Sequence, residues 1–232
     1  FPSRRSAVMG RRGMVSASQP LAAEVGLQAL RAGGHAVDAA VATASALAVV
    51  EPTGTGLGGD CFALVYDARS RVVQALDGSG RSPAALTAEL LRRRGHATMP
   101  VRGALAVTVP GAVDAWAELL AVHGRTTLAE ALAPAAALAR DGFPASELVA
   151  AAWRRSEALL AASPEGLAHL LPQGRAPRPG EVVRMPALAG ALAAVAEGGP
   201  DAFYRGPIAE DLVAVVQRAG GVLDAGDLAA HR

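Results

Sequence analysis

The stretch from Val49 to Arg81 constrains the fold of this chain more than any other. A helical pattern of small residues stops at Glu51-Pro52, and a loop rich in glycine and threonine follows. Two runs of β-like sequence, Cys61–Tyr66 and Arg71–Leu76, are joined by a short polar turn and predict a β-hairpin. A second glycine-bearing loop, 77–81, comes next. The pattern therefore predicts two glycine-rich loops at one end of a hairpin, the kind of place where a rigid scaffold carries function.

Most of the remaining chain has a helical pattern. Ser18 is expected to cap a helix that has Pro20 at its start and ends at Gly33-Gly34. The sequence Thr127-Leu-Ala-Glu130 is a capping box that opens a later helix. Pro134 is expected to kink or end that helix, because proline has no backbone N–H to donate.

Three further segments depart from the helical pattern. Gly13–Ala17 and Ala104–Val109 are short runs with β-like sequence. The run from Ser163 to Gly180 contains four prolines and is the least regular part of the chain. We expect it to be a long surface connection inside one domain, since the helical patterns on its two sides are alike.

Composition excludes several functional classes. Hydrophobic residues make up 51% and charged residues 19% of the 232 residues, which excludes general disorder. The net charge is +1, with arginine as the only basic residue besides histidine, so no basic face predicts a nucleic-acid partner. The apolar run 36–50 is too short to cross a bilayer and contains Asp38, which argues against a membrane partner. One cysteine cannot form an internal disulfide, so we expect a cytoplasmic protein.

The segment Gly54–Gly59 satisfies the pattern G-x-G-x-x-G of dinucleotide-binding loops. Such a loop needs a strand before it and a helix after it, so that the pyrophosphate meets a helix N-terminus. Here the predicted order is reversed, and no Gly-Lys-Ser/Thr ending supports a phosphate-binding loop of the other kind. We therefore expect no nucleotide cofactor and interpret the glycines as a tight backbone corner that needs positive φ.

Other chemistry-bearing residues are expected to be structural. The histidines are scattered and have no metal-ligand spacing, so no metal site is predicted; they are His35, His96, His123, His169 and His231. Cys61 has no histidine partner at a motif spacing and is interpreted as a small buried hydrophobe. Thr126-Thr127 could in principle supply a nucleophile after self-cleavage, but Thr127 already serves as a helix cap.

Arg81 is the strongest single candidate for binding. An arginine in a Gly/Ser loop beyond a strand end offers a bidentate fork to a carboxylate, with Ser79 in the same loop. The alternative is a surface arginine that pairs with a neighbouring acidic residue, and the sequence does not separate the two.

Taken together, several segments resemble the gamma-glutamyltransferase (gamma-glutamyltranspeptidase) family, in particular its cephalosporin-acylase-like branch. The first is the run of residues 13–60, which is specific enough to indicate the family by itself. The others follow in the family order: FALVYD, GSGRSP, VPGAVDAW, PAAALARDGF, FYRGPIAEDL and GGVLDAGDLAAHR.

The resemblance implies an α/β (α+β) fold of the N-terminal-nucleophile hydrolase type, a four-layer αββα sandwich. It also implies a proenzyme that cleaves itself before a threonine, whose hydroxyl then forms an acyl-enzyme with an amide substrate. Residues 1–232 are expected to be a helix-rich, single-domain portion of the large subunit. The catalytic threonine would then lie outside this chain, on a small subunit, and no cofactor is implied.

Two departures from the family pattern bear on the substrate. Well-characterised transpeptidases carry Arg-Glu-x-Ala-Pro where this chain has Ser79 to Pro83, so Ser79 takes the position of their carboxylate-binding arginine and Arg81 lies two residues later. Gly59-Asp60 likewise replaces a further Gly-Gly. We expect Arg81 and Ser79 to bind a gamma-glutamyl compound or a related acyl amide. A cephalosporin or glutaryl acylase, or a non-catalytic ligand-binding relic, is the alternative.

Overall fold

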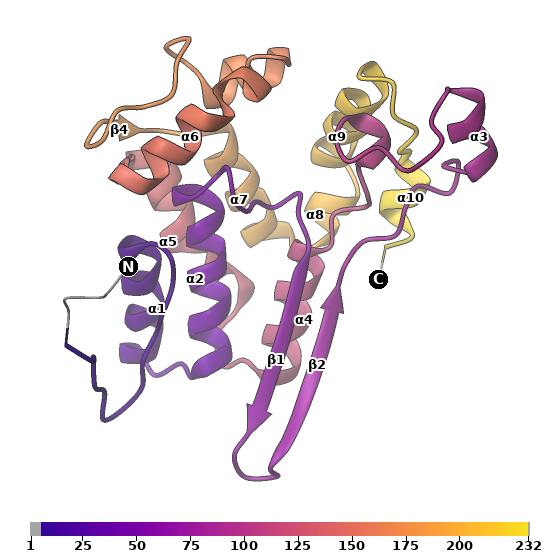
Figure 1. The fold of residues 1–232 in the computed structure, drawn as a ribbon. Coiled ribbons are helices and arrows are strands. Elements are labelled where there is room, and N and C mark those ends of the chain that lie inside the picture. Colours follow the sequence, from indigo (N-terminus) through magenta and orange to yellow (C-terminus); the bar gives the residue numbers. More distant parts are fainter. Residues whose placement is uncertain (1–5, 232) are drawn as a thin grey trace.

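The computed structural model describes residues 6–231 of the chain, which is rich in helices (Figure 1). Its α-helices are α1 (Pro20–Arg31), α2 (Ala36–Val50), α3 (Ala88–Arg93), α4 (Ala112–His123), α5 (Leu128–Asp141), α6 (Glu147–Leu160), α7 (Pro186–Gly198), α8 (Asp201–Tyr204), α9 (Pro207–Arg218) and α10 (Ala225–Ala229). The strands are β1 (Cys61–Asp67), β2 (Val72–Gly78), β3 (Phe143–Pro144) and β4 (Val182–Val183). A 3₁₀ turn (Ala104–Ala106) and a π-helical turn (Gly166–Leu170) complete the elements.

Helix α2 lies at the centre of the helical layer, with α1 and α5 packed against it and α7 packed against α5 (Figure 1). Its buried side chains are small, among them Val41, Ala46 and Val49. Small side chains let helix axes approach closely: a Cβ placed on Gly26 of α1 would lie 2.2 Å from the Thr43 hydroxyl oxygen of α2. The core is thus built from alanine and valine contacts between helices, in keeping with an aromatic content of 3%.

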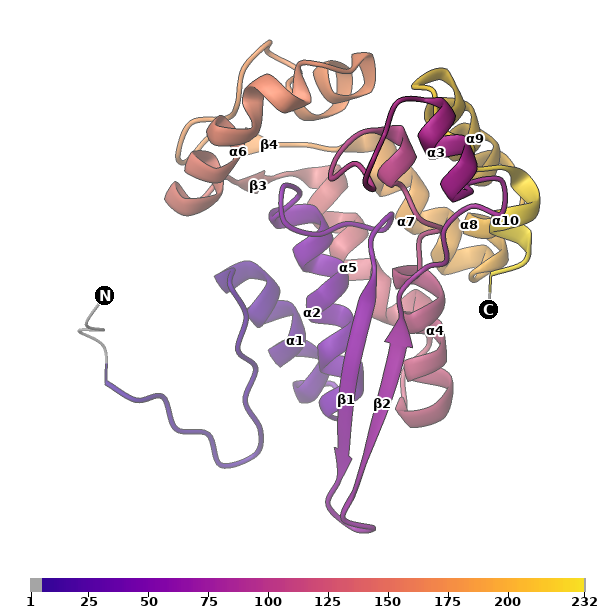
Figure 2. The ribbon, with the colours of Figure 1, turned by 45° about the vertical axis from the view of Figure 1, so that its right-hand side comes forward.

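Strands β1 and β2 form the predicted hairpin, paired antiparallel from Cys61 opposite Gly78 to Asp67 opposite Val72. Cys61, Ala63 and Val65 face the helices and pack against the core. The opposite side, which we call the outer face, exposes Phe62, Leu64, Tyr66 and Val73. The hairpin runs alongside α4, and its turn projects beyond the helices (Figure 2).

Two predictions at the N-terminal side are wrong. Helix α1 begins at Pro20 with Gln19 as its N-cap, and the Ser18 hydroxyl donates instead to the carboxylate of Glu51. Residues 13–17 are extended but are not assigned to a strand, because among residues 6–231 no neighbouring strand pairs with them. A strand needs such a partner for its backbone N–H and C=O groups.

The capping box at Thr127 is confirmed. The Thr127 hydroxyl accepts from the Glu130 amide at 3.2 Å, and the Glu130 carboxylate accepts from the Thr127 amide at 2.7 Å. Pro134, however, does not end α5, which continues to Asp141. Packing against α2 and α7 buries Leu132 and Ala135 on either side of the proline, and this tertiary packing holds the helix together.

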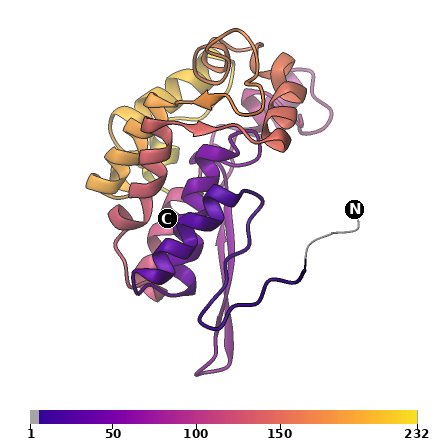
Figure 3. The same ribbon diagram turned by 90° about the vertical axis from the view of Figure 1, so that its left-hand side faces the viewer.

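The two remaining irregular segments also contain short helical turns. Ala104–Val109 is not a strand; it holds the 3₁₀ turn and then an extended loop. The connection 163–180 contains the π-helical turn, whose Leu170 carbonyl accepts from the Trp153 indole at 2.9 Å. The following residues return to β4, which pairs with β3 at the opposite end of the molecule from the hairpin turn (Figure 3).

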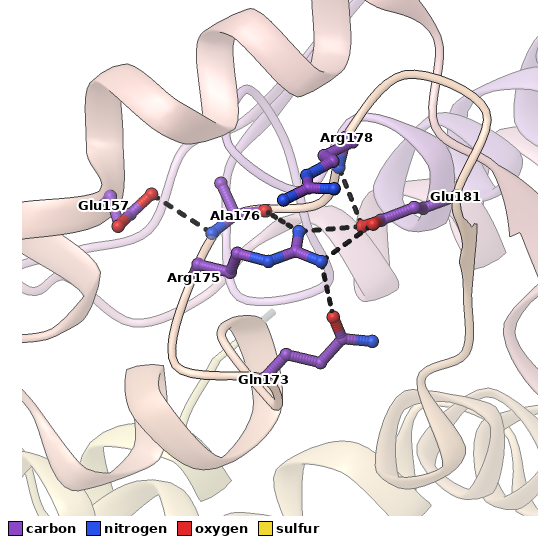
Figure 4. A network of polar contacts seen from close by, with 6 residues as sticks. All are labelled: Glu157, Gln173, Arg175, Ala176, Arg178 and Glu181. Atoms are coloured by element: carbon purple, nitrogen blue, oxygen red, sulfur yellow. Dashed lines mark hydrogen bonds and ion pairs between the residues drawn. The ribbon is translucent and has the colours of Figure 1, made fainter.

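A polar network fixes the end of that connection (Figure 4). Arg175 pairs bidentately with Glu181, at 2.9 and 2.8 Å, and also donates to the Gln173 side chain at 2.8 Å. The side-chain bonds from Arg175, together with the amide of Arg178, hold the pKa of Glu181 at about 2. The segment is therefore an ordered part of the surface, tied down by its own side chains.

Among residues 6–231, none of the helices combines the length and the apolar character needed to cross a membrane.

Candidate functional site

The two glycine-rich loops meet at one end of the hairpin, as the sequence predicts. We call this place the loop junction and define it by residues 59–60, 78–81 and 109–111. The carbonyl of Gly59 accepts from the amides of Gly111 and Ala112, at 3.0 and 2.9 Å. The carbonyl of Arg81 accepts from the amide of Val109 at 2.9 Å. Backbone bonds therefore connect both loops to the segment that leads into α4.

Close backbone approach explains the glycines of the second loop. A Cβ on Gly80 would lie 1.4 Å from the carbonyl oxygen of Val109, and one on Gly111 would lie 1.9 Å from that of Gly78. A Cβ on Gly78 would in turn meet the Cys61 carbonyl oxygen at 2.7 Å. No side chain fits at these positions, so three segments of backbone pack directly on one another.

The first loop, Gly54–Gly59, differs from its prediction. The order of helix, loop and strand is confirmed, because α2 ends at Val50 and β1 begins at Cys61. The expected positive φ is wrong, since the loop's glycines are absent from the positive-φ residues of the described chain. The loop closes by turn bonds instead, such as the Gly59 amide to the Gly56 carbonyl at 3.1 Å. Apart from the glycine itself and its two chain neighbours, no atom of residues 6–231 lies within 4 Å of a Cβ built on Gly56 or Gly58.

Asp60 has a role in the junction that the sequence reasoning did not assign to it. Its carboxylate accepts from the Gly80 amide at 3.3 Å and so connects the first loop to the second. The amide of the neighbouring Ser79 donates to the Asp77 side chain at 2.9 Å, which closes a local turn and leaves Ser79 exposed. No sequence pattern signals the Asp60 bond, because it joins residues twenty positions apart.

Arg81 lies at the edge of the junction with its side chain exposed. Its guanidinium Nη2 donates to the carbonyl of Ala230 at 3.2 Å, just beyond α10. None of the ion pairs within residues 6–231 includes Arg81, so the predicted alternative of an acidic neighbour is not seen there. A guanidinium carries five N–H donors, so one bond to a carbonyl leaves it able to take a carboxylate bidentately.

The Tyr204 side chain fixes the segment that leads into α4 by hydrogen bonds to its backbone. The tyrosine hydroxyl donates to the Pro110 carbonyl at 2.8 Å and accepts from the Asp114 amide at 3.3 Å. Burial raises the pKa of the Tyr204 hydroxyl well above its ordinary value, so this group stays protonated and keeps donating. The junction therefore rests on a buried and permanently neutral support.

The residues interpreted as structural occupy structural positions. Thr126 donates both its amide and its hydroxyl to the buried carboxylate of Asp38, each at 2.9 Å. Cys61 faces the core, and burial raises the pKa of its thiol, which disfavours the nucleophilic thiolate. Within residues 6–231, no three His, Cys, Asp or Glu side chains gather closely enough to hold a metal ion.

Comparison with known proteins decides the family. The sequence model of the family described as Gamma-glutamyltranspeptidase matches residues 22–232. The chain belongs to the gamma-glutamyltranspeptidase family. Its helical layer and hairpin are those of the N-terminal-nucleophile hydrolases in this family, so the predicted fold class is confirmed.

Individual family members place the chain in the acylase-like branch. The solved structure of a cephalosporin acylase from Bacillus halodurans superposes with a TM-score of 0.93 at 43% identity, covering 100% of this chain and 44% of that one. The glutathione hydrolase-like YwrD proenzyme of Bacillus subtilis is 39% identical over 97% of this chain and 43% of its own length. The oxamate amidohydrolase proenzyme of Klebsiella pneumoniae is 41% identical over 95% of this chain and 42% of its own length. The chain thus spans about two fifths of the length of these two relatives.

Proposed function

We propose that this chain is the large-subunit portion of a gamma-glutamyltransferase-like amide hydrolase or acyl transferase. The observation that most supports this proposal is the loop junction. In a member of this family, it presents the Arg81 guanidinium on a backbone held by hydrogen bonds. The substrate class that such a group selects is an acyl amide whose acyl part ends in a carboxylate. Arg81 would bind that carboxylate, and Ser79, in the same loop, would contact the substrate beside it.

In the proposed reaction, the hydroxyl of a threonine outside this chain attacks the amide carbon, and its proton passes through the threonine's own α-amine to the departing amine. The C–N bond breaks and an ester links the acyl group to the threonine. Water or a second amine then attacks the ester, releasing an acid or a new amide and restoring the hydroxyl. The role of residues 1–232 is to hold the far end of the acyl group, so that the carbonyl meets the nucleophile in a reactive position.

The partner in this proposal is a small subunit that carries the threonine. The outer face of the hairpin supports it, because Phe62, Leu64 and Tyr66 are 68%, 78% and 61% exposed. Apolar side chains gathered in this way are typical of a surface that another element covers. Six of the relatives also have the word proenzyme in their names, in keeping with maturation by cleavage.

A second candidate is an acylase that acts on glutaryl-type amides. Ser79 stands where the gamma-glutamyl enzymes carry their carboxylate-binding arginine, and the cephalosporin acylase is 43% identical to this chain. Arg81, two residues further on, would then bind the carboxylate from a shifted position. Both candidates share the acyl-enzyme chemistry and differ in whether the substrate's α-amine is recognised.

The deciding experiment uses the protein expressed from its complete gene. Intact-mass measurement with N-terminal sequencing is expected to find two polypeptides, the smaller beginning with threonine. Hydrolysis of γ-glutamyl and glutaryl p-nitroanilide then separates the candidates, because the glutaryl group lacks only the α-amine. Butyryl p-nitroanilide, which lacks the carboxylate as well, tests whether the carboxylate is recognised at all. A single uncut polypeptide without hydrolysis would refute the enzyme and favour a non-catalytic relic.

For the compartment we propose the cytoplasm. Cys61 is the single cysteine of the chain, so an internal disulfide, the usual adaptation to oxidising compartments, is not available to it. Cell fractionation with an antibody tests this directly, and recovery from the periplasm or the medium would overturn it.

A further inference from the structure

The segment 224–231 lies against the loop that carries Arg81, close to where the chain leaves β2 (Figures 1 and 2). Two bonds join them. The carboxylate oxygen Oδ1 of Asp227 accepts from the amide of Ala84 at 2.9 Å. The carbonyl of Ala230 accepts from the Arg81 guanidinium at 3.2 Å. One bond thus fixes the backbone three residues after Arg81, and the other fixes the direction of its side chain.

The segment itself is firmly anchored. Leu228 is fully buried, and the Ala229 carbonyl accepts from the Arg205 side chain at 2.9 Å. The ring of His231 stacks on Tyr204 with 5.0 Å between ring centres, and its side chain is only 7% exposed. Because Tyr204 also supports the loop junction from behind, one anchor serves both the junction and the segment that orients Arg81.

The two carboxylate oxygens of Asp227 have different roles. Its Oδ2 accepts from the Asp224 amide at 3.0 Å, while Asp224 Oδ1 accepts from the Asp227 amide at 2.8 Å. These reciprocal bonds form the capping box of α10. The bond from the Ala84 amide to Oδ1 of Asp227 is not part of the capping box. It connects α10 to the loop that carries Arg81. Asp224 and Asp227 therefore share the capping task, and only Asp227 contacts the loop.

We propose that Asp227 is a positioning residue that sets the loop 79–84, and through it the Arg81 guanidinium, for the carboxylate of the substrate. The part of this inference that concerns the substrate rests on the function proposed above. Arginine has many side-chain rotamers, so an unguided guanidinium would spend little time in the gripping orientation. The two bonds from segment 224–231, to the Ala84 amide and to the Arg81 guanidinium, restrict that freedom before the substrate binds. We call this pair of bonds the clasp.

The test compares Asp227→Ala with Asp224→Ala in the mature enzyme made from the complete gene. Each variant removes one bond of the same capping box, and Asp227→Ala also removes the bond from Ala84, so its loss in thermal stability is expected to equal or somewhat exceed that of Asp224→Ala. Only Asp227→Ala frees the loop, and it is expected to raise KM for glutaryl p-nitroanilide about tenfold with kcat little changed. For butyryl p-nitroanilide, and in Asp224→Ala with either substrate, KM is expected to stay near the wild-type value. Equal KM changes in the two variants would overturn the proposal.

A readout independent of catalysis keeps the two proposals distinguishable. Amide hydrogen exchange of the peptide that contains Ala84 is expected to be about tenfold faster in Asp227→Ala than in Asp224→Ala. If Asp227→Ala does not fold, Ala84→Pro removes the same bond from the donor side. Unchanged exchange would refute the clasp whatever the kinetics. Faster exchange in a protein that hydrolyses none of the anilides would instead retain the clasp and refute the proposed function.

Discussion

At the scale of single residues, the charged groups of Asp38 and Arg81 serve opposite purposes, one in the fold and one in the proposed binding site. Asp38 is completely buried at the start of α2, where its two oxygens accept from the amides of His35, Arg125 and Thr126 and from the Thr126 hydroxyl. Arg81 is exposed and has one bond to a carbonyl. The first charge is fully used by the fold, whereas the second is available to a ligand.

Replacing Arg81 with alanine tests this reading. Because a charge-assisted pair is worth about 1.5–3 kcal/mol, we expect KM for glutaryl p-nitroanilide to rise roughly tenfold to a hundredfold. For butyryl p-nitroanilide, which lacks the carboxylate, KM is expected to change little. Steady-state kinetics on both substrates gives the answer, with Arg69→Ala in the hairpin turn as a matched control. Similar changes on both substrates would remove Arg81 from the binding site.

Asp38 predicts how stability depends on pH. Burial alone raises the pKa of this carboxyl, but the amides of His35, Arg125 and Thr126 outweigh burial and lower the pKa to about 2. The ordinary value in an unfolded chain is about 3.9, so the folded state favours the ionised form. The stabilisation is therefore complete above about pH 4 and is lost as the pH falls toward 2.

The matching variant is Asp38→Asn, in which an amide group replaces one accepting oxygen and faces N–H donors. We expect it to lower the free energy of unfolding by about 2–4 kcal/mol at pH 7. The difference from the wild type is expected to shrink as the pH falls from 4 to 2, because the wild type loses its ionised carboxylate. Urea denaturation at several pH values measures both quantities, and a difference that does not change with pH would contradict the assignment.

At the scale of elements, the two glycine loops predict different outcomes for the same substitution. Gly80→Ala would put a Cβ 1.4 Å from the Val109 carbonyl oxygen, so the loops must separate. Overpacking of this kind costs about 1–3 kcal/mol or more. Gly56→Ala meets no atom within 4 Å from residues 6–231, and its φ is not left-handed. We therefore expect thermal denaturation of the mature protein to reveal a large loss for Gly80→Ala and little change for Gly56→Ala.

Elements whose signals are local could be predicted from the sequence. The hairpin, the capping box at Thr127 and the helix end at Gly33 depend on residues a few positions apart, and all three are confirmed. Two predictions that depended on a distant partner were wrong. Ser18 bonds Glu51, thirty-three positions away, instead of capping α1. The extended run 13–17 has strand-like side chains, but a strand also requires a neighbour, which sequence periodicity does not supply.

The candidate site was predictable in outline and not in detail. Glycine content located both loops, and Arg81 was recognisable as an arginine beyond a strand end. Positive φ was expected for the glycines of the first loop, 54–59, and is not found there. In the second loop, Gly78 and Gly80 are required by the close approach of neighbouring backbone. The bonds from Asp60 and Asp227 cross between segments, and no local pattern encodes them.

At the scale of the whole molecule, the outer face of the hairpin tests the proposed association with a small subunit. If a small subunit covers this face, Leu64→Asp would place a charge in the middle of the apolar contact, where an unpaired carboxylate is strongly disfavoured. We expect size-exclusion chromatography of the mature protein to find the two subunits separated or the protein aggregated. Arg69→Asp, in the exposed turn of the same hairpin, is expected to leave them together. An intact Leu64→Asp complex would place the small subunit elsewhere.

The projecting hairpin also has a consequence for the order of events during biosynthesis. Within residues 6–231, each of its two strands has one edge without a backbone partner, and its outer face is apolar. Open edges of this kind are templates for joining other chains, and cells tolerate them poorly. A piece released before the rest of the polypeptide had folded over it would be a substrate for chaperones and proteases. Maturation of a two-subunit enzyme on this scaffold should therefore proceed by folding first and cutting second, with the uncut chain acting as its own assembly factor.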